Sequence, residues 1–224
     1  MKPGPAADAD RNEATVSAGS FKDWLAAATD ADHTDNDVPC GTCTACCRSS
    51  YFVHVRPDEH DTRRHIPKAL LFPAPGRPKG HHLMGYDERG RCPMLLEDAD
   101  GRTGSLGCSI YDHRPQTCRT FDCRVFAAAG VDPDDDGKSA IAERVRQWRF
   151  DDVPTDPEAQ RLLDAVRRAA AYLDLHRPDL FDGGDHLEPP TTAGQLADLA
   201  VRAHPAFLGP DGDPTLEQVR KRLA

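Results

Sequence analysis

Apolar side chains recur every three or four residues through much of the second half of the chain. The clearest stripe lies within residues 157–176 and consists of Leu162, Leu163, Val166, Ala169, Ala170 and Leu173. This spacing predicts an amphipathic helix that stops at Pro178. Similar periods predict helices over residues 124–129, 139–150, 193–203 and 215–223. We therefore expect residues 131–224 to form a helical region.

The N-terminal part is less regular. Residues 1–19 are rich in Ala, Asp, Gly and Pro and have no periodicity, which predicts a flexible tail. Ser20 is a suitable N-cap for a short amphipathic helix that docks through Trp24. We expect this helix and an acidic link to occupy residues 20–37.

Residues 38–130 combine turn formers and prolines with short strand-like runs such as residues 51–55. Within them, the Pro/Gly-rich residues 70–85 are expected to form an irregular excursion over the surface. Residues 38–130 hold all eight cysteines of the chain, which are Cys40, Cys43, Cys46, Cys47, Cys92, Cys108, Cys118 and Cys123. The predicted fold class is α+β: a small, irregular, cysteine-rich module with short strands, flanked by α-helices and followed by a helical C-terminal part.

Charge and hydropathy narrow the class of protein. The formal net charge of -9 argues against general nucleic-acid binding, which depends on Lys and Arg neutralising phosphates. The sequence has no apolar run of about 18 residues and no cationic start followed by an apolar stretch. We therefore expect a cytoplasmic protein that binds neither a membrane nor nucleic acid.

A cytoplasmic location changes the interpretation of the cysteines, because the cytosol keeps structural thiols reduced. Metal ligation is then the leading interpretation, and residues 38–130 are predicted to be a metal-binding domain. An even number of cysteines also suits the disulfide framework of a secreted protein, which remains the alternative.

The first four cysteines are closely spaced. Cys40, Cys43 and Cys46 lie three residues apart, a spacing at which a turning backbone can direct successive thiolates at one centre. Cys47 directly follows Cys46, and neighbouring side chains tend to diverge. We expect this pair to serve different centres or to form a bridging arrangement.

The last four cysteines are spread more widely. Residues 114–115, Arg-Pro, suit the start of a helix that would place Cys118 and Cys123 about 140° apart. These two thiols are expected to face different centres unless the helix ends between them.

Eight thiols suit either two tetrahedral zinc sites or two four-cysteine iron–sulfur clusters. Either centre is anionic, and the cations expected to neutralise it are Arg48, Arg114, Arg119 and Arg124. The C-x15-C-x9-C-x4-C spacing of the later cysteines is not typical of zinc modules, whereas the run at residues 40–46 is similar to that of ferredoxins. Spacing therefore favours an iron–sulfur cluster over Zn²⁺.

Three sequence features together resemble a known family. They are the run C-x2-C-x2-C-C at residues 40–47, the pair Cys92-Pro93, and CSIYDHRPQTCRTFDC at residues 108–123. They resemble the CxxCxxCC, or YkgJ-type, cysteine-cluster family, a zinc- or iron-chelating domain that is sometimes labelled iron–sulfur-containing. The resemblance covers about residues 38–128 and all eight cysteines, and it implies metal binding. A related cysteine pattern occurs in flagellin lysine methylases.

Other residues carry weaker signals. Residues 132–143 match the EF-hand loop, but Ser139 replaces the usual aliphatic residue and no second loop exists, so an acidic turn is preferred to a Ca²⁺ site. The histidines between the cysteine groups are expected to be solvated rather than ligands; they are His54, His60, His65, His81 and His82. The residues expected to shield the centre are Ile110, Tyr111 and Phe121.

Three functions follow from these features. The first is an iron–sulfur redox protein, with a protein redox partner or an oxidoreductase activity. The second is a structural zinc-binding interaction module without catalysis. The third is a protein lysine methyltransferase-like enzyme, which rests on the family resemblance alone because the chain lacks a glycine-rich nucleotide loop and a set of catalytic residues.

Overall fold

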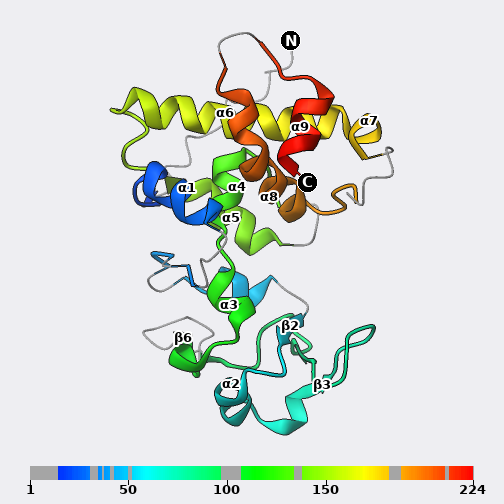
Figure 1. The fold of residues 1–224 in the computed structure, drawn as a ribbon. Coiled ribbons are helices and arrows are strands. Elements are labelled where there is room, and N and C mark those ends of the chain that lie inside the picture. The colour runs from blue at the N-terminus through cyan, green and yellow to red at the C-terminus, as the bar shows by residue number, and fades with distance from the viewer. Residues whose placement is uncertain are drawn as a thin grey trace, which may run out of the picture.

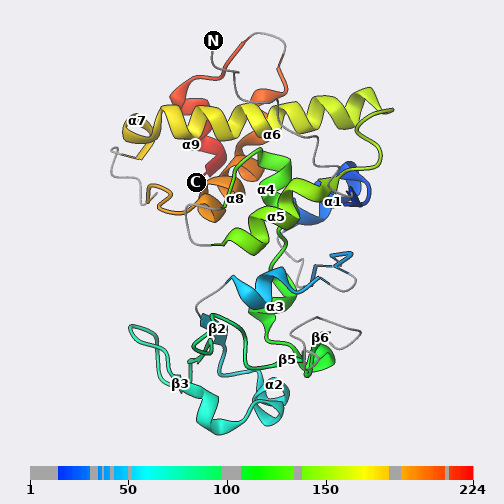
Figure 2. The same ribbon diagram turned by 180° about the vertical axis from the view of Figure 1, so that it is seen from behind.

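The computed structural model describes residues 15–30, 35–36, 38–40, 43–49, 52–96, 107–133, 138–181, 188–209 and 212–223. These residues form two lobes, a helical lobe and a cysteine lobe with short strands (Figures 1 and 2). The α+β class is confirmed, and each lobe has its own cluster of buried apolar side chains. No described helix is long and apolar enough to cross a membrane.

The helical lobe is built from seven α-helices of the described residues. They are α1 (Phe21–Thr29), α4 (Arg124–Ala129), α5 (Ser139–Gln147), α6 (Pro157–Leu175), α7 (Arg177–Phe181), α8 (Ala193–Ala203) and α9 (Leu216–Leu223), with a 3₁₀ helix η5 (His204–Phe207). Helix α6 packs against α8, and α4 packs against both. The predicted stripe on α6 faces this core, where Leu163, Val166 and Leu173 are buried.

The longest helix begins and ends as its sequence dictates. The Asp156 carboxylate accepts a hydrogen bond from the Glu158 amide over 2.9 Å, and Pro157 occupies the first helical position. Helix α6 ends at Leu175, one residue before the predicted end at His176. A second helix, α7, begins at Arg177 and includes Pro178 in its first turn. Proline is tolerated there because the first N–H groups of a helix have no partner within the helix.

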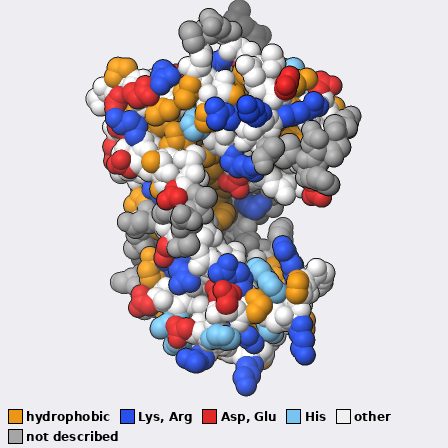
Figure 3. Space-filling view, viewed as in Figure 1, with side chains coloured by type: hydrophobic (Ala, Val, Ile, Leu, Met, Phe, Trp, Pro, Cys, Tyr) orange, Lys and Arg blue, Asp and Glu red, His pale blue; other side chains and the backbone are white. Residues whose placement is uncertain are grey.

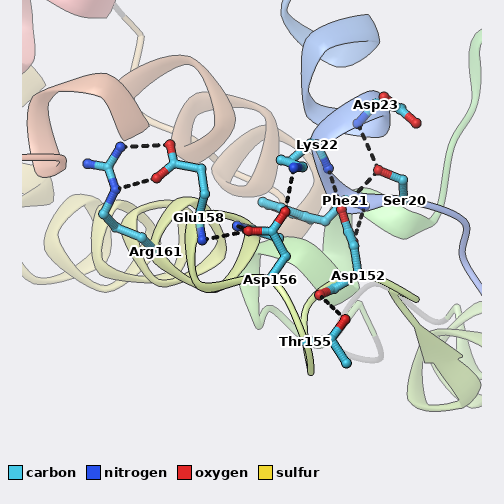
Figure 4. A network of polar contacts seen from close by, with 10 residues as sticks. Ser20, Phe21, Lys22, Asp23, Asp152, Thr155, Asp156, Glu158 and Arg161 are labelled. Atoms are coloured by element: carbon cyan, nitrogen blue, oxygen red, sulfur yellow. Dashed lines mark hydrogen bonds and ion pairs between the residues drawn. The ribbon is translucent and has the colours of Figure 1, made fainter.

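Helix α1 docks on the loop before α6 through a polar network (Figure 4). Asp152 accepts hydrogen bonds from the Phe21 amide over 2.6 Å and the Ser20 hydroxyl over 2.9 Å. Lys22 forms an ion pair with Asp156. Ser20 caps the helix and Trp24 is buried, so both predictions for this helix are confirmed.

Two short strands differ from the predicted pattern. Strand β1 (Val16–Ser17), which lies in the range assigned to the tail, pairs in parallel with β7 (Trp148–Arg149). Ala18 follows it and is fully buried. Helix α5 accordingly ends at Gln147 instead of Phe150, because Trp148 takes an extended conformation to join β1.

The cysteine lobe contains a three-stranded antiparallel sheet in the order β2-β4-β3. Its strands are β2 (Phe52–Val55), β3 (Leu71–Pro73) and β4 (His82–Gly85), and Met84 on β4 is the partner of both Val53 and Leu71. The prediction of an irregular excursion over residues 70–85 is therefore wrong. Met84 and Val55 are almost fully buried, and their packing stabilises the strands. The Pro/Gly-rich composition of residues 70–85 gives no sign of this packing.

Short elements complete the cysteine lobe. They are the helices α2 (His60–His65) and α3 (Gln116–Thr120), the strands β5 (Leu95–Leu96) and β6 (Gly107–Cys108), and the 3₁₀ helices η1 (Ala45–Arg48), η2 (Lys68–Leu70) and η3 (Tyr111–His113). The chain rises from α3 into α4 and so joins the two lobes (Figure 1). The shortness of these elements leaves a small apolar cluster, in which Cys92 is itself a member.

A buried ion pair fixes the junction between the lobes. Asp122, between α3 and α4, contacts the Arg124 guanidinium at 2.7 Å and accepts a hydrogen bond from the Trp24 indole over 2.9 Å. Arg124 also donates to the Ala18 carbonyl over 3.0 Å. These partners come from α1, from the residue after β1 and from α4, so the ion pair links three segments of the helical lobe next to Cys123.

Candidate metal centre

All eight cysteines are free thiols, so no disulfide joins them. They come from six short segments. Cys40 and Cys43 precede η1, Cys46 and Cys47 lie on it, Cys92 precedes β5, Cys108 ends β6, Cys118 lies on α3 and Cys123 caps α4.

Three thiols gather on the side of the helical lobe. The charges of Cys40 and Cys43 both raise the pKa of Cys123, although burial is the larger cause and takes that pKa to about 12. The Cys123 sulfur accepts a hydrogen bond from the Trp148 indole N–H over 3.2 Å. Burial raises the pKa of Cys40 to about 11.

The other five thiols gather within the cysteine lobe. Burial raises the pKa of Cys118 to about 12, and the charges of Cys46, Cys92 and Cys108 add to the shift. The chain segments are linked directly, because the Cys92 amide donates to the Cys47 carbonyl over 2.7 Å. A tyrosine holds the same turn, since the Tyr86 hydroxyl donates to the Cys46 carbonyl over 2.8 Å.

Cys46 and Cys47 are in contact rather than divergent. The Cys47 thiol donates a hydrogen bond to Cys46, which lowers the pKa of Cys46 and raises that of Cys47. The short 3₁₀ turn of η1 keeps the two sulfurs together. Of the two arrangements expected from the sequence, the contact resembles the bridging one. The charge of Cys46 also raises the pKa of Cys40, so Cys46 affects thiols of both groups.

Cys118 and Cys123 do not share a helix, because α3 ends at Thr120. The Asp122 carboxylate then accepts a hydrogen bond from the Arg124 amide over 2.9 Å and starts α4. The break sends the two thiols to opposite lobes: Cys118 packs on the apolar cluster of the cysteine lobe, and Cys123 belongs to that of the helical lobe.

Two guanidinium groups face the thiols. Arg114 lowers the pKa values of Cys46, Cys108 and Cys118, and Arg144 on α5 lowers that of Cys40. The Nε atoms of both arginines are buried, and neither of these two atoms has a hydrogen-bond partner among the described residues. Each thiol group therefore has a guanidinium near it, and this cation can offset the negative charge of a metal–thiolate centre.

The prediction that four arginines neutralise the centre agrees with the structure only in part. Arg114 faces the thiols, but Arg119 donates to the Gln116 side chain over 3.1 Å and Arg124 is paired with Asp122. Arg144 was missed, because nothing in its helical sequence pattern indicates that α5 packs against η1. Its guanidinium also stacks on the Trp148 ring at 4.3 Å.

The donor set fits a metal centre. Desolvation makes several of the thiols poor acids, and a bound cation is the ordinary way to stabilise buried thiolates. Soft thiolate ligands select zinc or iron–sulfur clusters. Among the described residues, no three cysteine sulfurs lie within 4.8 Å of one another.

The remaining candidates have different outcomes. Ile110 is buried, but Tyr111 and Phe121 are 57% and 37% exposed, so only the first can shield a centre. Of the EF-hand pattern, residues 134–137 lie outside the described part, and Asp132 forms an ion pair with Arg146 at 3.1 Å.

Histidine side chains gather on the cysteine lobe (Figure 3). His54 and His81 are paired, with 2.8 Å between their ring nitrogens. His65 lies in a cluster with Asp61 and His113, whose ligand atoms are all within 4.8 Å of one another. This cluster was missed because His113 comes from a distant part of the chain and carries no spacing signal of its own.

A cysteine-rich metal-binding domain is the class that this fold and these thiols define. Residues 39–136 match the CxxCxxCC family model, described as "Putative zinc- or iron-chelating domain". The match supports metal binding by this segment of the chain. No curated protein and no solved structure matches the chain.

Proposed function

We propose that the eight cysteines hold iron–sulfur clusters and that the protein is a redox or electron-transfer protein. The observation that carries the proposal is the number of thiols in one electrostatic environment. The charge of Cys46 raises the pKa values of Cys40 in one thiol group and of Cys118 in the other, so the two groups adjoin. A single zinc ion takes only four ligands and cannot engage all eight thiols. Two adjacent four-thiolate centres suit this arrangement, and the spacing of the cysteines favours iron–sulfur cores over zinc ions at those centres.

The neighbouring contacts suggest two sets of four ligands. One set is Cys40, Cys43, Cys46 and Cys123, and the other is Cys47, Cys92, Cys108 and Cys118. The first set needs a fourth ligand, and Cys46 is assigned to it because its charge raises the pKa of Cys40, although it raises that of Cys118 as well. Its contact with Cys47 then brings the two sets side by side.

Once bound, such a cluster supplies electron transfer. The protein's own residues bind and tune it: Arg144 and the Trp148 N–H act on the first set, and Arg114 acts on the second. Hydrogen bonds and positive charge near ligand sulfurs stabilise the more negative, reduced state, so these groups raise the reduction potential.

A structural zinc module is the second candidate, favoured by the small apolar cluster of the cysteine lobe. A lobe with so little core needs another source of stability, and bound metal provides one. In this case the protein would present the lobe to a partner without redox chemistry.

Anaerobic purification followed by elemental analysis and an absorption spectrum separates the two. Iron with inorganic sulfide, a visible chromophore that bleaches on reduction and returns on oxidation, and little zinc are the expected result. A colourless protein that contains about two zinc ions and no iron, even after anaerobic reconstitution with iron and sulfide, would refute the redox proposal and favour the structural module.

A further inference from the structure

A second set of metal-ligating side chains lies on the cysteine lobe apart from the thiols. Asp61 and His65 lie one turn apart on α2, and His113 comes from η3, which packs against that helix. One ligand atom from each of the three residues lies within 4.8 Å of the other two. Positions i and i+4 share a helix face, so Asp61 and His65 project toward the same place.

The three side chains touch one another. The rings of His65 and His113 are stacked, with centroids 3.6 Å apart and 6° between their planes. The Asp61 carboxylate lies 2.5 Å from Nδ1 of His113. Two imidazoles and a carboxylate are therefore already gathered, and little reorganisation is needed to bring them to one ion.

The hydrogen bonding of His65 leaves one ring nitrogen available. Nδ1 of His65 lies 3.0 Å from the main-chain carbonyl oxygen of Asp61. A carbonyl can only accept, so Nδ1 carries the proton and the lone pair is on Nε2. Metal-binding histidines commonly have this arrangement, with one ring nitrogen donating to a carbonyl and the other facing the ion.

A buried carboxylate holds α2 against the segment that carries His113. Glu59 accepts a hydrogen bond from the Gln116 amide over 2.5 Å and another from the Arg56 amide over 2.6 Å. Thr62 on α2 donates to the Arg114 carbonyl over 3.5 Å. The backbone on both sides of the cluster is thus fixed by contacts that do not involve its three side chains.

We propose that Asp61, His65 and His113 bind a divalent transition-metal cation such as Zn²⁺. Imidazole with one carboxylate suits Zn²⁺, Ni²⁺ or Cu²⁺, whereas Mg²⁺ and Ca²⁺ prefer all-oxygen sites. Three protein ligands leave a coordination position for water. Asp61 and His65 are exposed, so the ion exchanges directly with solvent, unlike one held by the buried thiols.

Calorimetric titration of the full chain with Zn²⁺ tests this site, after the metal held by the cysteines has been loaded and quantified. We expect one additional Zn²⁺ per chain, with no change in the metal already bound. The His65→Ala and His113→Ala variants should each bind the additional ion at least about tenfold more weakly. Mg²⁺ at the same concentration should give no binding heat.

His60→Ala is the matched control, because His60 is exposed on the same helix but lies outside the cluster. His81→Ala controls for the histidine pair with His54. Both variants should bind Zn²⁺ as the wild type does. The proposal is wrong if the wild type takes up no additional ion, or if the His65→Ala and His113→Ala variants bind it as tightly as the wild type.

A purely structural role for the cluster is also distinguishable. Asp61→Asn preserves the size of the side chain but removes the anionic ligand, and its folding is checked by its thermal transition. If this variant and the two histidine variants only lower the melting temperature, and the wild type shows no Zn²⁺-dependent rise in melting temperature, the cluster is a hydrogen-bonded contact and not a metal site.

Discussion

The indole N–H of Trp148 donates a hydrogen bond to the sulfur of Cys123 over 3.2 Å. Trp148 belongs to the short strand β7 and is only 3% exposed, so this bond is made inside the core of the helical lobe. It lowers the pKa of Cys123, opposing the larger effect of burial. The core of one lobe therefore acts directly on a thiol at the junction with the other.

Trp148→Phe keeps an aromatic ring in the core and removes the N–H donor. We expect metal bound by Cys123 to be held about tenfold more weakly, because outer hydrogen bonds to ligands contribute on that scale. If the centre is an iron–sulfur cluster, its reduction potential should also fall. Chelator competition and a redox titration measure the two effects.

Trp24→Phe is the control for that substitution. It removes another indole hydrogen bond, to Asp122 over 2.9 Å, but leaves the bond to the sulfur in place. Its metal affinity should stay near that of the wild type even though it loses about 1 kcal/mol of stability. Equal metal affinities of the Trp148→Phe variant and the wild type would contradict a tuning role for Trp148.

Substitution of single cysteines tests the two proposed ligand sets. Cys123→Ser should reduce the metal bound with Cys40 and Cys43, and Cys118→Ser should reduce that bound with Cys92 and Cys108. Each variant is then expected to retain about half of the metal of the wild type, as measured by elemental analysis. Complete loss in both would instead indicate one shared centre, and full retention in both would exclude these cysteines as ligands.

Metal removal should unfold the two lobes to different extents. The buried cluster of the cysteine lobe is small and contains Cys92, whereas that of the helical lobe extends through α4, α6 and α8. After chelation, the amides of β2 and β4 should lose most of their protection from hydrogen exchange, and those of α6 should keep it. Equal protection of β2 before and after chelation would show that the lobe is stable without metal.

Asp122→Ala should be among the most destabilising substitutions outside the cysteines. The carboxylate pairs with Arg124, and the two side chains are only 9% and 10% exposed. Removing one partner of a buried pair leaves an uncompensated charge and costs about 3 kcal/mol or more. Chemical denaturation gives the free energy of unfolding.

Glu158→Ala is the surface counterpart of that substitution. Glu158 pairs with Arg161 at 2.8 Å, but both side chains are about half exposed. An exposed pair contributes little because water screens it, so this variant should stay close to the wild type. A similar loss of stability in the two variants would argue against burial as the reason for the cost at Asp122.

The helices were predictable because their signals are local. The stripe around Val166 and the cap at Ser20 each act within one or two turns, and both appear as expected. The hairpin of β3 and β4 was not predictable in this way. Its strands are short and joined by a Gly- and Pro-rich connection, and they are stabilised by the packing of Met84 against distant residues.

The candidate site was also predictable only in part. The identities of the thiols are visible in the sequence, but their grouping depends on where the chain turns. Cys123 meets Trp148 only because α3 ends at Thr120 and α5 folds back onto η1. Such meetings join residues far apart in the sequence, and neither spacing nor periodicity predicts them.

A buried histidine in the helical lobe should make stability depend on pH. His204 is 7% exposed, and its Nδ1 lies 2.6 Å from the Val201 carbonyl oxygen, to which it donates. Burial lowers the pKa of His204 in the folded protein. Below about pH 6.5, the unfolded chain therefore takes up a proton that the folded chain resists, and stability falls as the pH falls from there toward the folded pKa.

His204→Asn isolates this contribution because the Asn amide can still donate to the Val201 carbonyl but does not titrate. The free energy of unfolding should fall less steeply with decreasing pH in this variant, by up to about 1.4 kcal/mol per pH unit. Parallel curves for the wild type and His204→Asn between pH 6.5 and 5 would show that His204 is protonated equally in both states, against the effect expected of its burial.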